Sequence, residues 1–204
     1  MPEVSPTIDS TVAFYDDHAA AYAAMTEALD ISALYAPFLR HLPPGGHILD
    51  AGSGSGRDTA AFLALGYRVT AFDASAKLAA YSSAKTNQPT LVLRFEDVAW
   101  AQDFDGVWAS ASLLHLPAPE LNDAIYRLAR ALRPSGVLFA SFQEGTGTAV
   151  RDGRIFTLTT ANQLRDRVGS IPELDIISVS READRTRYGL TWLQLLAIRT
   201  NTAP

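Results

Sequence analysis

Three glycines at alternate positions, Gly52, Gly54 and Gly56, lie between two carboxylates, Asp50 and Asp73. Because glycine has no Cβ, a loop built from it can turn sharply and place its backbone against a ligand. The carboxylates can accept hydrogen bonds from hydroxyl groups or hold a cation. These residue types at this spacing predict a binding site for a nucleotide-like ligand.

The elements expected around the loop would position these groups together. The apolar run 46–51 predicts a short buried strand, and residues 59–65 predict a helix. Residues 67–72 predict a second strand, which leaves Asp73 at its carboxyl end. A strand, a glycine loop and a helix form the opening unit of a nucleotide-binding α/β domain, and its ligands lie at the carboxyl ends of the strands.

The class of ligand follows from the residues on either side of the loop. Asp73 stands about 20 residues after the loop, where a carboxylate accepts hydrogen bonds from the hydroxyls of an adenosine ribose in dinucleotides and adenosyl cofactors alike. Arg57 occupies the place of the third glycine of a dinucleotide loop, which favours the adenosyl class. Asp50 would oppose a pyrophosphate but suits a cationic ligand such as an ammonium group. Glu96 and Asp97 follow the third predicted strand, within reach of an adenine amine.

Strands and helices alternate over residues 46–142. Further strands are predicted at 90–95, 103–109 and 137–142, with helices between them. Short apolar strands separated by helices imply a parallel sheet covered on both faces. A polar loop over 143–157 and a helix over 160–168 then precede two strands, 174–180 and 191–199. The expected fold class is α/β, a doubly wound, mostly parallel seven-stranded sheet with helices on both faces and an antiparallel C-terminal hairpin.

The composition is that of an ordinary globular domain, with 204 residues of which 48% are hydrophobic and 19% charged. The net charge of -5 argues against a nucleic-acid partner. The absence of cysteine excludes disulfides and cysteine metal sites and is typical of a cytoplasmic protein. No apolar stretch approaches the ~20 residues that span a bilayer. Residues 1–10 are polar and predict a mobile tail, and we expect no metal and no membrane partner.

Five motifs in order closely resemble those of the class I S-adenosylmethionine-dependent methyltransferases. They are the loop 50–56 (DAGSGSG), residues 69–75 (VTAFDAS), the acidic pair 96–97, residues 104–109 with 112–115 (FDGVWA and SLLH), and the turn 133–138 (RPSGVL). The resemblance covers residues 15–199. It is greatest to small bacterial enzymes related to tellurite-resistance and thiol or small-molecule methyltransferases.

This resemblance implies a Rossmann-like fold, S-adenosylmethionine as cofactor and S-adenosylhomocysteine as product. It implies one methyltransferase domain over 11–204, with lid helices in 11–42, a cofactor-binding core in 46–142, and a substrate loop and hairpin in 143–204. The residues that would bind the cofactor run from its methionine end to its adenine end, then to the floor and the lid of the site. They are Asp50, Ala51, Gly52, Gly54 and Arg57; Asp73 and Ala74; Glu96, Asp97 and Val98; Ala111 and Ser112; and Tyr15 and Tyr22.

The reacting groups are less explicit in the sequence. His115 is the candidate general base because the pKa of histidine lies near neutral pH, although it could instead be a hydrogen-bonded structural residue. A thiolate acceptor would need no base, whereas a hydroxyl or an ammonium would. Arg57, Arg151 and Arg154 could attract an anionic substrate, and the last two could equally be solvated loop charges.

We therefore expect an enzyme that transfers a methyl group from S-adenosylmethionine to a small-molecule acceptor by in-line displacement, as a monomer or homodimer. Two alternatives stay open. One is a nicotinamide-dependent oxidoreductase, favoured by Asp73 and the general βαβ plan. The other is a non-catalytic module that binds the cofactor without chemistry. The choice of acceptor must lie with residues 15–25, with His115 and with the loop 143–154.

Overall fold

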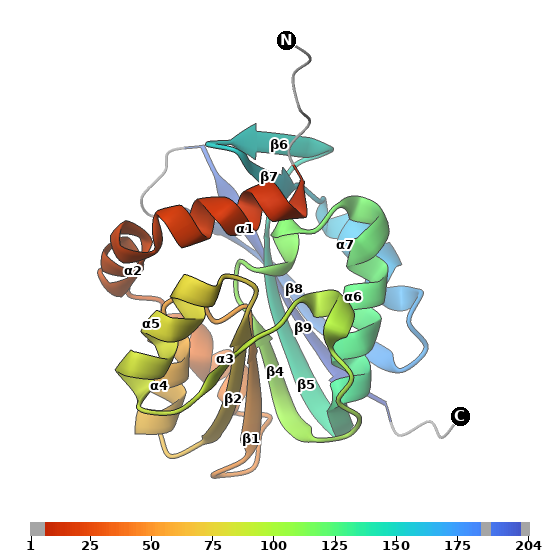
Figure 1. Ribbon diagram of the computed structural model, residues 1–204. Helices are drawn as coiled ribbons and strands as arrows, with labels where there is room; N and C mark the ends of the chain where they lie inside the picture. Colours follow the sequence, from red (N-terminus) through yellow and green to blue (C-terminus); the bar gives the residue numbers. More distant parts are fainter. Residues whose placement is uncertain (1–6, 185–188, 201–204) are drawn as a thin grey trace.

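The computed structural model describes residues 7–184 and 189–200, and helices and strands alternate through its central part (Figure 1). The elements in chain order are α1 (Ile8–Asp17), α2 (Ala19–Glu27), η1 (Ser32–Leu34), α3 (Tyr35–Leu39), β1 (His47–Ala51), α4 (Arg57–Ala64), β2 (Arg68–Asp73), α5 (Ala76–Thr86), β3 (Thr90–Val92), η2 (Phe95–Asp97), β4 (Phe104–Ala109), η3 (Leu113–His115), α6 (Ala118–Ala131), β5 (Leu132–Gln143), β6 (Thr148–Arg151), β7 (Arg154–Thr157), α7 (Ala161–Gly169), β8 (Leu174–Ala183) and β9 (Thr191–Arg199).

Seven strands form one sheet in the order β3-β2-β1-β4-β5-β9-β8. Neighbours from β3 to β5 pair in parallel, whereas β9 pairs antiparallel with both β5 and β8. The strand order reverses beside β1, and this is the place where an open α/β sheet leaves a crevice at its carboxyl edge. The predicted fold class, with its antiparallel C-terminal hairpin, is confirmed.

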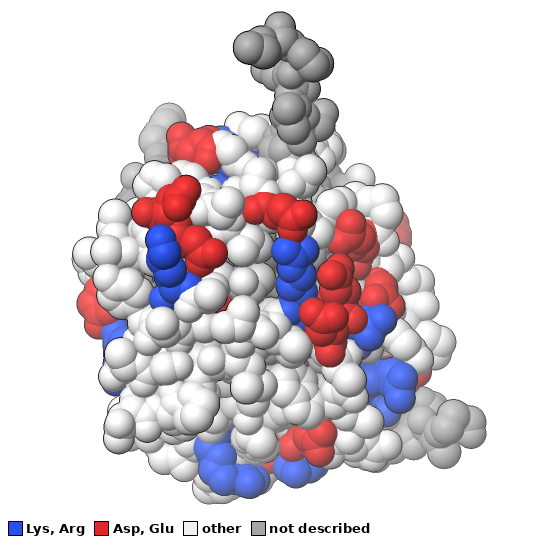
Figure 2. Space-filling view, in the orientation of Figure 1, with Lys and Arg blue, Asp and Glu red and all other residues white. Residues whose placement is uncertain are grey.

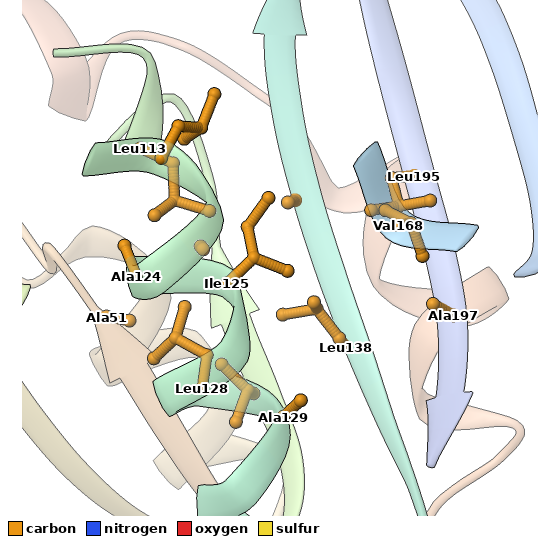
Figure 3. Close-up of a cluster of buried hydrophobic side chains, with 14 of the residues drawn as sticks. Ala51, Leu113, Ala124, Ile125, Leu128, Ala129, Leu138, Val168, Leu195 and Ala197 are labelled. Carbon is orange, nitrogen blue, oxygen red and sulfur yellow. The ribbon is translucent and has the colours of Figure 1, made fainter. Parts of the chain in front are cut away.

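Helices cover both faces of this sheet. On one face, Phe38 of α3 and Phe62 of α4 pack against Trp108 and Phe139 of the sheet, and all four are almost fully buried. On the other face, α6 and α7 cover the larger cluster, in which Leu128 packs toward Leu138 of β5 (Figure 3). Since each helix presents an apolar stripe to the sheet, the core holds the strand ends in fixed positions.

The N-terminal prediction was wrong at its start. Residues 7–10 belong to the helical region and not to a mobile tail, because Thr7 caps α1 in a reciprocal capping box with Ser10. Residues 1–6, the rest of the predicted tail, lie outside the described residues. The first two helices of the N-terminal region, α1 and α2, meet at His18.

The prediction of a loop over 143–157 was also wrong in part, because this segment contains the hairpin β6–β7. Arg151 pairs with Arg154, and the two residues between them, Asp152 and Gly153, have φ values of 52° and 78°. A two-residue Asp-Gly turn with positive φ at both positions favours a tight hairpin. This dipeptide was the available signal in the sequence.

The hairpin lies beside α1, which crosses the upper end of the sheet in Figure 1. The Ser10 hydroxyl donates to the carbonyl of Gly153, and the backbone N–H of Ile155 donates to Thr11. The Arg154 guanidinium lies over the ring of Phe14, 4.2 Å from its centroid. The first helix and the hairpin are therefore joined into one cover above the carboxyl ends of the strands.

Candidate functional site

The glycine loop between β1 and α4 has the backbone that its sequence predicts. Gly52, Gly54 and Gly56 all have φ between 56° and 79°, a region that residues with a Cβ rarely adopt. A Cβ on Gly52 would lie 2.4 Å from the Cβ of Ser112, and one on Gly56 would lie 2.6 Å from the hydroxyl of Ser82. The loop can therefore pass this close to its neighbours only as glycine.

Asp73 lies at the carboxyl end of β2, as predicted, and faces the loop. Its two carboxylate oxygens accept the backbone N–H groups of Gly54 at 2.8 Å and Ser75 at 2.9 Å. Burial raises the pKa of this carboxyl to about 6, against the effect of these two donors. Because a carboxylate has about four acceptor positions, Asp73 keeps capacity for the two hydroxyls of a ribose.

Asp50 is the second predicted carboxylate, and it is only 2% exposed. Among the described residues it accepts one hydrogen bond, from the hydroxyl of Thr59 at 2.5 Å. Burial, and next the charge of Asp58, raise the pKa of Asp50 to about 8. A cationic ligand group in the adjoining cavity would stabilise the charged form of this buried carboxyl, which burial otherwise disfavours.

Arg57 and Asp58 form a buried network that the sequence analysis did not foresee. The Arg57 guanidinium binds both oxygens of Asp58, at 2.7 and 3.1 Å. The hydroxyl of Tyr35 and the indole N–H of Trp108 also donate to Asp58, each at 2.8 Å. Arg57 lines the cavity described next, but Asp58 already neutralises its charge.

Two adjoining cavities lie at the carboxyl edge of the sheet, with volumes of about 460 Å³ and about 100 Å³. The smaller cavity is bounded by Asp73, Ala74 and Phe95 and by Ile8 of α1. The larger cavity extends from Asp50 and the glycine loop toward α2, η1, β5 and β9. Both share one set of wall residues, namely Tyr15, Tyr22, Gly52, Gly54, Ser110, Ala111 and His115.

His115 lies on this shared wall with its hydrogen bonds fixed. Its Nδ1 is 2.7 Å from the carbonyl oxygen of Ile155, which can only accept, so Nδ1 carries the ring hydrogen. Nε2 is then an acceptor, and the Tyr15 hydroxyl, 2.8 Å away, donates to it. Burial, and then the charge of Arg154, lower the pKa of His115 to about 4. The imidazole is therefore neutral at neutral pH, and it orients the oxygen of Tyr15.

A His115→Gln variant should lose part of the acid sensitivity of folding. The unfolded chain, with a histidine pKa near the usual ~6.5, binds more protons than the folded chain between pH 4 and 6.5. The wild-type free energy of unfolding therefore falls as the pH is lowered through this window. We expect the variant to have a shallower fall, by up to about 1.4 kcal/mol per pH unit, in urea titrations. The exposed His41→Gln is the control and should follow the wild type; an equal slope for His115→Gln would contradict the assignment.

Most of the predicted site residues line the two cavities, and five do not. Glu96 and Asp97 of η2 are exposed and line neither cavity. Their neighbour Phe95 lines the smaller cavity instead. Arg151 also lines neither cavity, whereas Arg154 lines the larger one. Ala51 and Val98 are buried in the core cluster. Ser112 lines the smaller cavity and donates its hydroxyl hydrogen to the carbonyl of Ala51.

A polar wall of the larger cavity was missed altogether. It consists of Ser141, Gln143, Trp192 and Gln194, which lie on adjoining strands β5 and β9. The alternation of polar residues with Phe142 and Leu193 in an otherwise apolar stretch was the signal available in the sequence. It was not interpreted because both strands otherwise have the composition of core.

The described part of the chain adds three observations about partners. Over residues 7–184 and 189–200, no three His, Asp or Glu side chains are grouped as ligands for a metal ion. None of the helices in this part of the chain has the length and apolar character needed to cross a membrane. On the face shown in Figure 2, acidic and basic side chains are interspersed.

Comparisons with known proteins agree with this geometry. Residues 49–140 match the family model described as a methyltransferase domain. No curated protein matches the sequence. One similar solved structure is a Burkholderia thailandensis 1,6-didemethyltoxoflavin-N1-methyltransferase with bound 1,6-didemethyltoxoflavin and S-adenosylhomocysteine, at 24% identity over 98% of this chain and 93% of that chain, with a TM-score of 0.79. A second is the [4+2]-cyclase SpnF, at 17% identity over 97% of this chain and 98% of that chain, with a TM-score of 0.76. A third is a Synechocystis magnesium protoporphyrin IX methyltransferase with bound S-adenosylmethionine, at 19% identity over 98% of this chain and 86% of that chain, with a TM-score of 0.62. At these identities the likeness shows the fold.

Proposed function

We propose that this chain, whose residues 49–140 match a methyltransferase domain, is a class I S-adenosylmethionine-dependent methyltransferase and that its methyl acceptor is a small molecule. The larger cavity carries this proposal. Its volume of about 460 Å³ falls in the range of about 300–1,000 Å³ that is usual for small-ligand sites. The Burkholderia enzyme, described with 1,6-didemethyltoxoflavin bound, supports the same class of acceptor.

The residues around the glycine loop have the chemistry that the cofactor requires. When bound, S-adenosylmethionine supplies a methyl group on a sulfonium sulfur, which an acceptor displaces in line. Asp73 would accept the ribose hydroxyls, and Asp50 would face the cationic ammonium group. The backbone of Gly52 and Gly54 would lie against the methionine part. The carboxylates of Asp73 and Asp50 keep hydrogen-bond acceptor positions that the described residues do not fill, and the glycines leave room beside the loop backbone.

The chain's own contribution to the transfer is to align the acceptor, to exclude water and to receive a proton where one is released. Tyr15 and Tyr22 line both cavities from α1 and α2, and they would cover the reacting region. The Tyr15 oxygen, whose hydrogen is directed to Nε2 of His115, would accept a hydrogen from an acceptor hydroxyl or amine. His115 would keep the Tyr15 oxygen oriented toward the acceptor, since its pKa of about 4 makes it a weak base. This role needs the neutral ring that burial maintains.

Transfer of a labelled methyl group tests the proposed function. The chain would be incubated with S-adenosylmethionine labelled in the methyl group and with panels of thiols, phenols, amines and metalloid anions. We expect label in at least one class of small molecule. Label recovered only in added protein would contradict the proposal, and persistent absence of turnover with the cofactor bound would favour the non-catalytic module. The kinship to tellurite-resistance enzymes, the cytoplasmic location and the monomeric or dimeric state stay predictions.

Binding of S-adenosylhomocysteine should release a proton through Asp50. At neutral pH this carboxyl holds its proton because its pKa is raised to about 8, and an ammonium group beside it favours the charged form. Calorimetry at pH 7 in two buffers of different ionisation enthalpy should therefore show about one proton released per site. We expect Asp50→Asn to release none. An identical proton count in wild type and Asp50→Asn would exclude Asp50 as the group that meets the cation.

A further inference from the structure

One face of the sheet changes from apolar to polar where it reaches the larger cavity. On β5, Phe139 packs against Trp108 in the core, and Ser141 and Gln143 follow it at alternate positions on the same face. Ser141 is opposite Gln194 of β9, and Gln143 is opposite Trp192. Ser141 and Gln143 are only 5% and 2% exposed. Burying polar side chains is costly unless they find partners, so this wall requires an explanation.

The amide of Gln143 is held in one orientation. Its Oε1 accepts the Arg151 guanidinium at 2.7 Å, and the guanidinium lies over the ring of Phe156. Because arginine can only donate, the amide nitrogen of Gln143 must lie on the other side. No hydrogen-bond partner of this nitrogen is present among residues 7–184 and 189–200. Gln143 therefore offers two N–H donors to the cavity that it lines.

Ser141 supplies a further donor on the same wall. Its hydroxyl oxygen accepts the backbone N–H of Ala111 at 2.8 Å, so the hydroxyl hydrogen is directed elsewhere. Within the described part of the chain no group accepts that hydrogen. Two positions along a strand correspond to about 7 Å, so the donors of Ser141 and Gln143 can meet oxygen atoms on one ring or on one side of it.

The rest of the cavity does not favour an anion. Of the two arginines that line it, Arg57 is paired with Asp58 and Arg154 with Asp152. Two acids, Glu182 and Asp184, stand at the same end as Gln143. They accept the side chains of Gln194 at 2.6 Å and Trp192 at 2.8 Å.

The remaining walls suit a flat molecule. Aromatic rings line several sides of the larger cavity, and they belong to Tyr15, Tyr22, Phe156 and Trp192. Planar rings bind well between aromatic side chains, since stacked and edge-to-face contacts are both favourable.

We propose that Ser141 and Gln143 donate hydrogen bonds to carbonyl oxygens of the methyl acceptor, which is a neutral, planar carbonyl compound such as a lactam. Arg151, which was expected to contact an anionic substrate, is a positioning residue that holds the Gln143 amide with its N–H groups toward the acceptor. This inference rests on the proposed function, because it places the acceptor in the larger cavity beside the cofactor.

Calorimetry with 2-quinolone, a planar lactam, tests the inference on the full chain saturated with S-adenosylhomocysteine. The wild type should bind 2-quinolone more tightly than 2-naphthoate, an anion of similar size. Loss of a donor to a buried oxygen should weaken 2-quinolone binding about tenfold in Gln143→Leu and in Gln143→Glu. The glutamate variant retains a partner for Arg151, so the wall should stay folded.

Variants of Arg151 separate positioning from simple structural support. Arg151→Met should weaken 2-quinolone binding about threefold, and Arg151→Lys, which keeps a donor to Gln143, should recover most of it. Arg127→Met, which removes an exposed arginine paired with Asp123 on α6, is the matched control and should bind as the wild type does.

The outcomes distinguish this inference from the proposed function. Unchanged 2-quinolone binding in both Gln143 variants, tighter binding of 2-naphthoate, or no binding of 2-quinolone to the loaded wild type would each overturn the inference. Failure of the wild type to bind S-adenosylhomocysteine would contradict the cofactor site instead, before any acceptor is added.

Discussion

An Asp58→Ala variant should lose about 3–5 kcal/mol of the free energy of unfolding, measured by urea titration of the circular dichroism signal. Asp58 is 6% exposed and accepts hydrogen bonds from Arg57, Tyr35 and Trp108. Removing the carboxylate leaves a largely buried guanidinium without its counter-ion and two donors without acceptors, and each is costly in the interior. Few single changes in this chain would disturb α3, α4 and β4 together.

Two further variants define the cause of this loss. Asp58→Asn keeps the volume of the side chain but removes its charge and one acceptor, so we expect a smaller loss. Asp123→Ala removes an exposed carboxylate from an ion pair with Arg127 and should cost only about 0.5 kcal/mol. A loss below about 1 kcal/mol for Asp58→Ala would mean that water replaces the network at little cost.

Asp73→Ala should weaken the binding of S-adenosylhomocysteine by at least about 100-fold, measured by calorimetry at pH 7.5. Hydrogen bonds from two ribose hydroxyls to one carboxylate are charge-assisted, and each such bond contributes about 1.5–3 kcal/mol. The same substitution releases the backbone N–H groups of Gly54 and Ser75, so the loop loses an anchor as well. At this pH the Asp73 carboxyl is ionised, because its pKa is about 6.

Asp97→Asn is the matched control for this measurement. Asp97 lies at the same edge of the sheet but is exposed and outside both cavities. We therefore expect its affinity for S-adenosylhomocysteine to stay within about twofold of the wild type. A large loss at Asp97 with little loss at Asp73 would restore the sequence-based expectation of an adenine contact from the acidic pair and would contradict the ribose assignment.

Local signals in the sequence predicted the part of the site that lies close together along the chain. Glycines at 52 and 54 and the carboxylate at 73 could be placed because the strand, loop and helix pattern fixes where strand ends meet. Ser75 is the N-cap of α5 and accepts the backbone N–H of Leu78, and a serine at a helix start is a signal that the local sequence carries. In each case the positioning interaction spans about 20 residues or fewer.

The parts that sequence reasoning missed depend on contacts between distant segments. Tyr35 and Trp108 meet Asp58 only because α3, α4 and β4 pack together in one cluster, and no spacing rule encodes this. Glu96 and Asp97 lie outside both cavities for a local reason. Strand β3 ends at Val92, three residues before η2 begins, so the acids turn outward while Phe95 points in.

The division of the walls between the two cavities has a consequence for how enzymes of this kind can diversify. Asp73, Ala74 and the glycine loop fall inside the segment 49–140 that matches the methyltransferase domain. Ser110, Ala111, Leu114 and His115 of the larger cavity also lie inside it, but much of the wall of that cavity comes from residues 25–34, 141–156, 182–184 and 192–194, which lie outside it. Substitutions or insertions there can alter which molecule is methylated while the cofactor cradle is inherited unchanged. New acceptors can therefore be acquired without first losing the source of the methyl group.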